Sequence, residues 1–578
     1  MTYCFRSGRF SSSSFSSCVR PLVCSLALAV LALATAPAVA QDVIVDDDGQ
    51  AALPTNCGGT GSVDDTIQDG IATASSGQTV FVCPGTYAEN VTVNKSVTLQ
   101  GNNVGTAGNG ARSSSESIID AGTGATDAGV TVAANNVTLD GLQFKGSVGV
   151  LVDGDLVANV TGLAVQNNRF RNDRAGASIT NVSNAGTGSF DINNNLIDLT
   201  QQFADSGTDG NADADATAPT AGFNIRTLDL ATPPSFTNNF FQDTDGDNLT
   251  AYYGIIFDGV NGTSGTNSGG PATITGGTIS GTAQAIAILD GQGGDPSINA
   301  TSNSHEPDES NFDIDNVTMN GFTGDANNVG AAGSLSDNDD IDFHAGVFVY
   351  TGGDSGEPVA SPLTTTGTIS DVTITGVKLA GGNGTESSGL YFGGFSEEFG
   401  GDNFAQQVTA TNVTIQNGLG RGVFSRGGLT DATVTQSTIE NMAQRSAGDV
   451  AVSVKLEKGG GLTLTESFVR GPSSVNGTAG PIIDANNSTA GSSISPIRLA
   501  VESTLIERNI STVDLARASK GSAPAFTANL SANAYVDATG PGVLTTATDI
   551  NNLISTSSAT IDFNPFLNSL TDTDTGTA

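Results

Sequence analysis

Five short segments that begin with glycine each end on a side chain that could take part in chemistry. They are Gly149 to Asp153, Gly222 to Arg226, Gly254 to Asp258, Gly346 to Tyr350 and Gly422 to Arg426. The first and third residues after each glycine are mostly apolar, so in a strand they point inward and the second and fourth residues point outward. The sequence therefore predicts an outward polar column of Asp153, Arg226, Asp258, Tyr350 and Arg426.

Asp258 and Arg226 are the candidate catalytic pair of this column. A carboxylate is a common general acid or base, and a cation beside it can hold an anionic substrate. An ordinary ion pair between two strands explains the same two residues more simply. The ion pair is the favoured interpretation and the catalytic role is the alternative.

A second acidic segment, Asp337 to His344, combines carboxylates with one of the two histidines of the chain. If it is extended, Asp340, Asp342 and His344 lie on one face. A histidine beside carboxylates can act as an acid or base near neutral pH. A solvated acidic loop is the simpler explanation of the segment.

Calcium is the one cofactor that the sequence suggests. Asp243, Asp245 and Asp247 have the carboxylate density that calcium prefers, as does the stretch from Asp205 to Asp215. An EF-hand is excluded because Gly254 stands where its bidentate glutamate would be.

Aromatic residues gather in a glycine-rich insert that should flank the polar column. They are Tyr391, Phe392, Phe395, Phe399 and Phe404. Aromatic rings on a loop can stack on sugar rings, although some of these should hold the loop against the body of the protein. Tyr391 and Phe392 are the candidate ligand-binding members, together with Asp153, Tyr350 and Arg426 of the column.

The charge of the chain argues against nucleic acid and anionic membrane surfaces as partners. Its 578 residues include 21 Lys and Arg against 59 Asp and Glu, a net charge of −38. Binding of nucleic acid or of an anionic membrane surface needs clustered basic residues. With 74 glycines and no tryptophan, the composition favours strands and turns over helices.

Residues 1–40 have the pattern of a secretory signal peptide. Three arginines precede the apolar run Leu22 to Ala34, and Ala38 to Ala40 gives a small-residue cleavage site. No later segment is apolar for long enough to span a membrane. Of the five cysteines only Cys57 and Cys83 would remain after cleavage, and in an oxidising compartment they most simply form one disulfide.

An internal repeat predicts the fold. An eight-residue pattern, in which two apolar positions are followed by a polar or small pair and a short strand, recurs along the chain. Its copies are Val137 to Phe144, Leu163 to Phe170, Phe190 to Ile197, Pro234 to Phe241, Ala272 to Ile279, Phe312 to Met319, Val372 to Leu379, Val408 to Ile415, Ala432 to Ile439, Leu462 to Val469 and Leu499 to Ile506. With a glycine-led strand after many copies, each repeat has three short strands. This predicts about 11–13 stacked coils of a parallel β-helix, while an antiparallel sandwich array is the alternative.

The repeat resembles that of the right-handed parallel β-helix, or pectate-lyase-like, superfamily over most of residues 43–567. The resemblance implies that the glycine-led strands form the first sheet, and that Asn167, Asn194 and Asn238 stack in the turn between the second and third sheets. A start at Ser62 to Asp65, followed by Ile67 and Ile71, looks like the short helix that caps the first coil. The expected organisation is a signal peptide at 1–40, an N-terminal cap and first coils at 41–100, the helix at 101–530, a C-terminal cap at 531–568 and a disordered tail at 569–578.

These features together predict an exported, acidic β-helix protein, secreted or at the cell surface, that binds polysaccharides or cell-surface glycans along its side. No nucleic acid partner and no membrane span after signal removal are expected. The alternative is a polysaccharide lyase, hydrolase or epimerase with its site on the outward face of the first sheet, although the Gly-His-Gly and Arg-Ile-Lys motifs of pectinolytic relatives do not occur. A purely structural adhesin or stalk is a third possibility.

Overall fold

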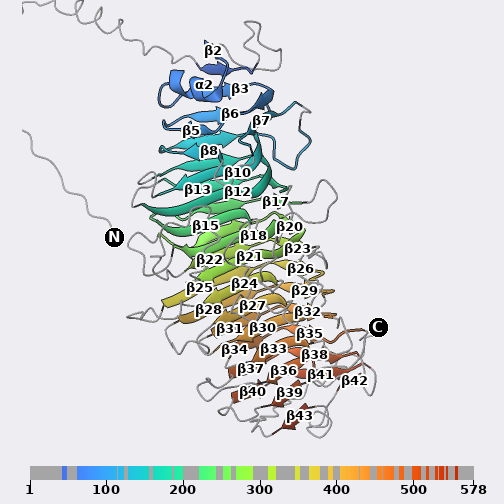
Figure 1. Cartoon of the computed structure of the whole chain (residues 1–578). Coiled ribbons are helices and arrows are strands. Elements are labelled where there is room, and N and C mark those ends of the chain that lie inside the picture. The colour runs from blue at the N-terminus through green and yellow to red at the C-terminus, as the bar shows by residue number, and fades with distance from the viewer. Residues whose placement is uncertain are drawn as a thin grey trace, which may run out of the picture. The chain divides into compact units, whose positions relative to one another are not determined.

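The computed structural model places three rows of parallel strands around one apolar interior (Figure 1). It describes residues 42–47, 62–112, 115–122, 128–154, 160–184, 188–199, 221–242, 251–261, 269–290, 310–320, 345–351, 363–377, 388–394, 404–418, 420–427, 430–442, 452–457, 460–473, 481–486, 498–509, 516–519, 527–531, 533–538, 542–543 and 554–557. The chain divides into two units, Met1–Gln41 and Asp42–Ala578, and all described residues lie in the second. The predicted signal peptide and C-terminal tail are outside the described residues.

The first row is a sixteen-stranded sheet, called here the sixteen-strand sheet. From β9 onward its strands carry the first half of the repeat. In spatial order they are β2 (Ser62–Asp64), β1 (Val43–Val45), β3 (Thr79–Val82), β6 (Thr98–Gln100), β9 (Val137–Asp140), β11 (Leu163–Gln166), β13 (Phe190–Asn193), β16 (Ser235–Thr237), β19 (Ala272–Thr275), β22 (Asn311–Asp315), β25 (Leu363–Ser370), β28 (Phe404–Thr411), β31 (Thr430–Thr435), β34 (Gly461–Thr465), β37 (Arg498–Glu502) and β40 (Thr527–Ser531).

The second row, called here the short-strand sheet, carries the second half of the repeat. Its strands are β4 (Gly85–Tyr87), β7 (Ser117–Asp120), the first parts of β10 (Gln143–Asp153) and β12 (Arg169–Asn184), β14 (Leu196–Ile197), β17 (Phe240–Phe241), β20 (Thr278–Ser280), β23 (Thr318–Asn320), β26 (Thr373–Thr375), β29 (Thr414–Gln416), β32 (Thr438–Glu440), β35 (Phe468–Arg470), β38 (Leu505–Arg508) and β41 (Ala534–Asp537). β42 (Gly542–Val543) pairs antiparallel with β41.

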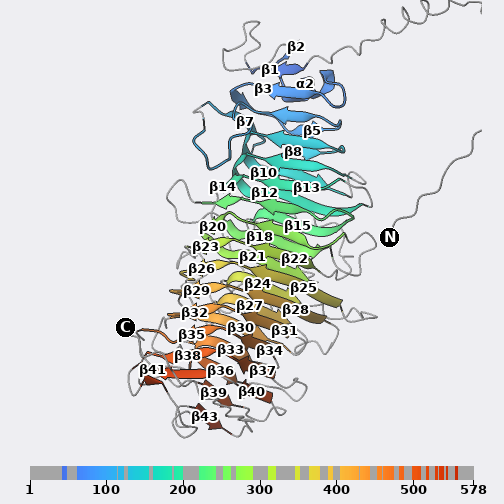
Figure 2. The same cartoon turned by 180° about the vertical axis from the view of Figure 1, so that it is seen from behind.

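The third row, called here the glycine-led sheet, holds the predicted column. Its strands are β5 (Val91–Val93), β8 (Ala128–Val132), the later parts of β10 and β12, β15 (Ala221–Leu230), β18 (Ala251–Val260), β21 (Thr282–Asp290), β24 (Ala345–Thr351), β27 (Ser388–Gly394), β30 (Arg421–Arg426), β33 (Val452–Glu457), β36 (Ile483–Asn486), β39 (Ala516–Ser519) and β43 (Ile554–Ser557). The chain visits the three sheets in turn, and each strand pairs in parallel with its counterpart in the next coil (Figure 2). The protein is therefore a parallel β-helix, as the repeat predicts, with the right-handed winding that the resemblance implies.

One copy of the repeat was assigned in the wrong register. The sequence pattern places a copy at Val372 to Leu379, but β26 (Thr373–Thr375) is already the short strand, and the first half of that copy lies in β25. Gly367 occupies the first inward position of the true copy, where a Cβ atom would lie 2.2 Å from the ring of Phe312. The aromatic ring of the preceding coil fills the place of the missing apolar side chain, so the apolar signal was absent from that position.

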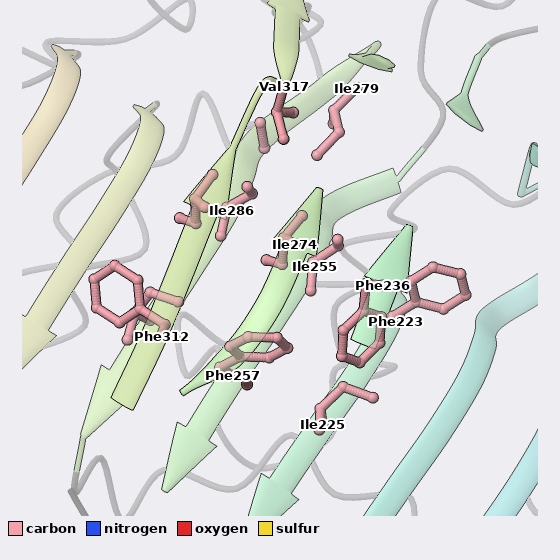
Figure 3. Close-up of a cluster of buried hydrophobic side chains, with 14 of the residues drawn as sticks. Phe223, Ile225, Phe236, Ile255, Phe257, Ile274, Ile279, Ile286, Phe312 and Val317 are labelled. Atoms are coloured by element: carbon pink, nitrogen blue, oxygen red, sulfur yellow. The ribbon is translucent and has the colours of Figure 1, made fainter. Parts of the chain in front are cut away.

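The core consists of the inward side chains of all three sheets. Figure 3 shows Phe223, Phe236, Phe257 and Phe312 among branched aliphatic residues in this interior. The ring centroids of Phe223 and Phe236 are 5.8 Å apart, and those of Phe236 and Phe257 are 5.3 Å apart. Coil-on-coil burial of such side chains provides the main stabilisation of a solenoid.

The leading glycines of the third sheet are required by close packing. A Cβ atom on Gly222 would lie 2.1 Å from the ring of Phe241 and 2.7 Å from the carbonyl oxygen of Gly254 in the next coil. A Cβ atom on Gly149 would likewise lie 2.5 Å from the ring of Phe170 and 2.4 Å from the carbonyl oxygen of Gly176. Glycine at this position lets the large residues of the short-strand sheet reach the corner of the coil.

The stacked amides lie one residue later than the resemblance implies. Asn167, Asn194 and Asn238 take the left-handed turn conformation, with φ of 56°, 54° and 52°, which asparagine tolerates better than most residues. The buried stack is formed instead by Asn168, Asn195 and Asn239. Asn168 N donates to Asn195 Oδ1 at 2.9 Å, and Asn195 N donates to Asn239 Oδ1 at 3.1 Å.

The helix expected near the N-terminus is α2 (Ile67–Thr73), and it packs against β1, β2, β3 and β5. It does not start at Ser62, which lies in β2; its N-cap is Thr66, whose hydroxyl accepts from Asp69 N. The Glu89 carboxylate accepts from the amides of Ile67 and Gln68, and Lys95 donates to carbonyls of the last turn. Opposite charges at the two ends complement the helix dipole. No helix within the described ranges has the length and apolar character needed to cross a bilayer.

Candidate functional site

The outward residues that the sequence singles out form one row across the glycine-led sheet. Strand pairing aligns, in order, Asp153, Thr180, Arg226, Asp258, Leu289, Tyr350, Gly393, Arg426 and Glu457. The predicted members therefore share a face, and one coil separates Asp153 from Arg226, Asp258 from Tyr350, and Tyr350 from Arg426. The sequence missed Glu457 because Ser453 occupies the glycine position of its strand, β33.

At the N-terminal end of the row, Arg226 and Asp258 form an ion pair on neighbouring coils. Arg226 Nη1 lies 3.5 Å from Asp258 Oδ2, and Arg226 Nε donates to Asn224 Oδ1 at 2.8 Å. Asn224 Nδ2 in turn donates to Ser178 Oγ at 3.2 Å. The cation is thus held by a carboxylate and an amide, as the ion-pair interpretation predicts.

Tyr253 lies in the same part of the face. Burial raises the pKa of Tyr253 to about 12, with a further rise from the Asp258 charge that the Arg226 charge opposes. The phenol is therefore protonated at neutral pH. It can donate a hydrogen bond at this site.

Asp153 and Asp258 do not have the spacing of a glycosidase pair. They are separated by three ladder steps, through Thr180 and Arg226. At about 4.8 Å per step the two carboxylates are about 14 Å apart along the row. Glycoside hydrolysis uses carboxyl groups roughly 5–9.5 Å apart. The arrangement excludes a hydrolase that depends on these two residues.

Aromatic side chains occupy the middle of the face. The rings of Phe348 and Tyr391 stack with centroids 4.6 Å apart, Tyr350 stacks on Phe348 at 5.7 Å, and Tyr391 meets Phe424 edge-on at 5.1 Å. All four are buried, and with Ile256 and Leu289 they form an apolar cluster outside the main core. Tyr350 is therefore packed among aromatic rings, whereas the sequence placed it in an open polar stripe.

Tyr391 and Phe392 were expected on a flanking loop, and this expectation was wrong. Both lie in strand β27, where Tyr391 points outward and Phe392 belongs to the interior core. Consecutive residues of a strand face opposite sides, so the two cannot contact the same ligand. Phe404 begins β28, while Phe395 and Phe399 lie outside the described residues.

At the C-terminal end of the row, Arg421, Arg426 and Lys455 gather around Glu457; we call these three residues the basic cluster. Lys455 Nζ lies 2.7 Å from Glu457 Oε2, and Arg426 Nε lies 3.7 Å from Glu457 Oε1. The guanidinium of Arg421 lies 4.1 Å from the ring centroid of Phe424, and Lys455 Nζ lies 5.5 Å from it. Strand pairing also sets Asp484 beside Lys455. The sequence revealed only Arg426, since the other members come from positions outside the predicted column.

The basic cluster makes the stability of this region depend on pH. Burial alone would raise the pKa of Glu457, but the Lys455 charge and hydrogen bond and the charges of Arg421 and Arg426 outweigh it and lower that pKa. The ionised form therefore stabilises the fold, and this contribution is lost as the pH falls from about 4.5 through the lowered value.

We expect Glu457→Gln to be less stable than the wild type at neutral pH, and the difference to narrow on acidification from about pH 6 to about pH 3. Urea unfolding at several pH values measures this. A difference between the two proteins that stays constant over this range would contradict the assignment.

Several candidate residues lie outside the described residues. They are Asp243, Asp245 and Asp247, the segment from Asp337 to His344, and Cys57. Cys83 is described and is buried directly after β3. Within the described ranges no group of three or more His, Cys, Asp or Glu side chains is placed to hold a metal ion. Calcium binding and the Cys57–Cys83 disulfide stay predictions.

Comparison with known proteins yields one short sequence relative and several distant structures. No family model matches the chain. A cell surface glycoprotein of Methanothermus fervidus is 37% identical over 108 residues, which cover 18% of this chain and 15% of that protein.

Among solved structures, the A-module of the Azotobacter vinelandii mannuronan C-5 epimerase AlgE6 has a TM-score of 0.34 at 11% identity, over 86% of this chain and 93% of that one. The catalytic unit of a GH87 alpha-1,3-glucanase from Streptomyces thermodiastaticus has a TM-score of 0.32 at 15% identity, over 88% and 72%. Because these likenesses are weak, the fold assignment rests on the strand pairing of the chain itself: this protein is a parallel β-helix.

Proposed function

We propose that this protein acts outside the cell or at its surface and binds anionic glycans along the glycine-led sheet, with the basic cluster as the main contact. The basic cluster is the observation that carries this proposal. In a chain with 21 basic and 59 acidic residues, three cations gather on two neighbouring strands of one face. Two acids accompany them, Glu457 and Asp484, so the local balance is positive where the chain as a whole is strongly negative.

The cluster has the components that a carboxylated or sulfated sugar requires. Arginine donates two parallel hydrogen bonds to a carboxylate or sulfate, and lysine adds a point charge. Phe424 lies beneath Arg421 and helps to fix the guanidinium in place. Arg426, Lys455 and Glu457 are only partly buried, so a sugar could reach this end of the row. The signal-peptide pattern and the partial similarity to a cell surface glycoprotein support the location.

We expect Arg426→Ala to weaken binding of uronate or sulfated oligosaccharides about tenfold, equivalent to about 1.4 kcal/mol, because it removes one charged contact. Arg470→Ala is the matched control: Arg470 pairs with Glu440 and Glu507 on the short-strand sheet, so this variant loses the same charge from another face. Titration calorimetry at low and high salt measures both variants. Equal weakening by the two substitutions, or equally tight binding of a neutral glucan, would contradict the proposal.

A further inference from the structure

Glu457 is the carboxylate that the basic cluster holds. Its Oε2 lies 2.7 Å from Lys455 Nζ, and its Oε1 lies 3.7 Å from Arg426 Nε. Although burial raises the pKa of Glu457, the charges of Lys455, Arg421 and Arg426 outweigh this effect and lower that pKa. An anionic group of a ligand would need the same three cations. Glu457 therefore occupies the place that such a group would take.

The two acids of this region differ in how accessible they are. Asp484 pairs in register with Lys455 and is only 2% exposed. Glu457 is the last residue of β33, and its side chain is 14% exposed. A glutamate at the end of a strand can turn away by rotating to another rotamer, without any movement of the strand itself. Glu457 is thus the acid of the pair that a ligand can displace.

Two of the cations have contacts that do not depend on Glu457. The guanidinium of Arg421 lies 4.1 Å from the ring centroid of Phe424, and Lys455 Nζ lies 5.5 Å from the same centroid. Phe424 is fully buried, so this ring is a fixed support for both charges. Asp484 stands beside Lys455 in the next coil. An anion that replaces the Glu457 carboxylate therefore meets cations that are already in position.

We propose that Glu457 is an internal competitor at the glycan site proposed above, on which this inference rests: the anionic group of the glycan must displace the Glu457 carboxylate in order to bind. A carboxylate tethered beside the cations competes at an effective concentration that is set by geometry and not by the amount of ligand. Its charge also cancels part of the positive potential that attracts the ligand. Glu457 thereby weakens the binding of anionic sugars by two routes, and both disappear when its charge is removed.

The test measures binding of oligogalacturonate and of a sulfated dextran oligosaccharide to the whole protein by titration calorimetry. Glu457→Gln keeps the size of the side chain and removes its charge, so we expect it to bind both ligands at least about fivefold more tightly than the wild type. Glu440→Gln is the matched control, because Glu440 pairs with Arg470 on the short-strand sheet and its loss removes the same charge from another face. We expect its affinities to stay within about twofold of the wild type. This control separates displacement from the general repulsion of an anionic ligand by a chain of net charge −38.

Glu457→Asp keeps the test decisive if the uncharged variant does not fold. This variant retains the charge but draws the carboxylate back by one methylene group, which weakens its contact with Lys455. We expect its affinity to lie between those of the wild type and Glu457→Gln. Thermal melting with and without oligogalacturonate gives a second measurement: the ligand should raise the melting temperature of each position-457 variant more than that of the wild type, since tighter binding stabilises the folded state more. Circular dichroism checks that every protein is folded.

The outcomes distinguish the competitor from the site itself. Equal or weaker binding by a folded Glu457→Gln, while Arg426→Ala still weakens binding, would overturn the competitor and leave the glycan site in place. An equal gain in Glu440→Gln would assign the effect to overall charge and would also overturn it. Binding that only the position-457 variants show would support the competitor. If neither the wild type nor any variant binds either ligand, the proposed function fails and the competitor fails with it.

Discussion

Replacing Phe223 with alanine is expected to lower the free energy of unfolding by about 3–5 kcal/mol. The Phe223 ring is fully buried and lies beside the ring of Phe236 (Figure 3). It also meets the rings of Phe170 in the preceding coil and Phe241 in the following coil. Its centroid lies 5.5 Å from that of Phe241 and 5.8 Å from that of Phe236. Alanine would leave a cavity that these rigid strands cannot close, and the cost of such a cavity adds to the lost transfer free energy.

Denaturant unfolding of the whole chain measures this effect. Phe240→Ala is the matched control, because Phe240 is half-buried in β17 on the outward side of the short-strand sheet. We expect it to cost about 1 kcal/mol or less. If the two substitutions lower the free energy of unfolding by the same amount, Phe223 does not lie in a close-packed core.

Asn195→Leu is expected to destabilise the protein by about 3–5 kcal/mol although leucine has nearly the same size. Asn195 is fully buried, and its amide donates to Val165 O at 2.9 Å and to Asn239 Oδ1 at 3.0 Å. Its Oδ1 accepts from Asn168 N at 2.9 Å. Leucine would remove all three bonds, and each buried group left without a partner costs about 1–3 kcal/mol.

Asn194→Gly provides the control at the neighbouring position. Asn194 is half-buried and has φ of 54°, a backbone conformation that glycine adopts readily. We expect a change within about 0.5 kcal/mol. Comparable losses at both positions would mean that the amide stack includes Asn194 and that the present assignment is wrong. Urea unfolding of the two variants, measured together, separates these outcomes.

Taken together, the two pairs of variants probe different kinds of order in the coil. Phe223 tests the packing of large apolar groups, for which total volume matters. Asn195 tests a hydrogen-bonded stack, for which the identity of each atom matters. In later coils, Ser437, Ser467 and Thr504 take the place of asparagine in the same stack. Each hydroxyl accepts a hydrogen bond from the backbone amide at the corresponding position of the preceding coil. The stack therefore tolerates hydroxyls, which predicts that serine at position 195 would be milder than leucine.

The local features of the β-helix were open to prediction because they depend on residues a few positions apart. Alternation of apolar and polar residues sets which side chains point inward, and it correctly placed Val150 and Val152 in the core. Neighbouring asparagines defeated the same reasoning. Asn194 and Asn195 are the same residue type. Only the backbone conformation decides that Asn194 occupies the left-handed turn position and that Asn195 joins the buried amide stack.

By itself, the sequence determined the parallel coil, the three strands of each repeat and the outward column, since all of these follow from short-range periodicity. Tertiary structure alone decided which distant residues meet. Inserts of different length separate the coils, so sequence distance says nothing about whether Arg421 lies near Lys455. These contacts depend on the register in which the strands of neighbouring coils are hydrogen-bonded. That register cannot be read from the spacing of residues along the chain.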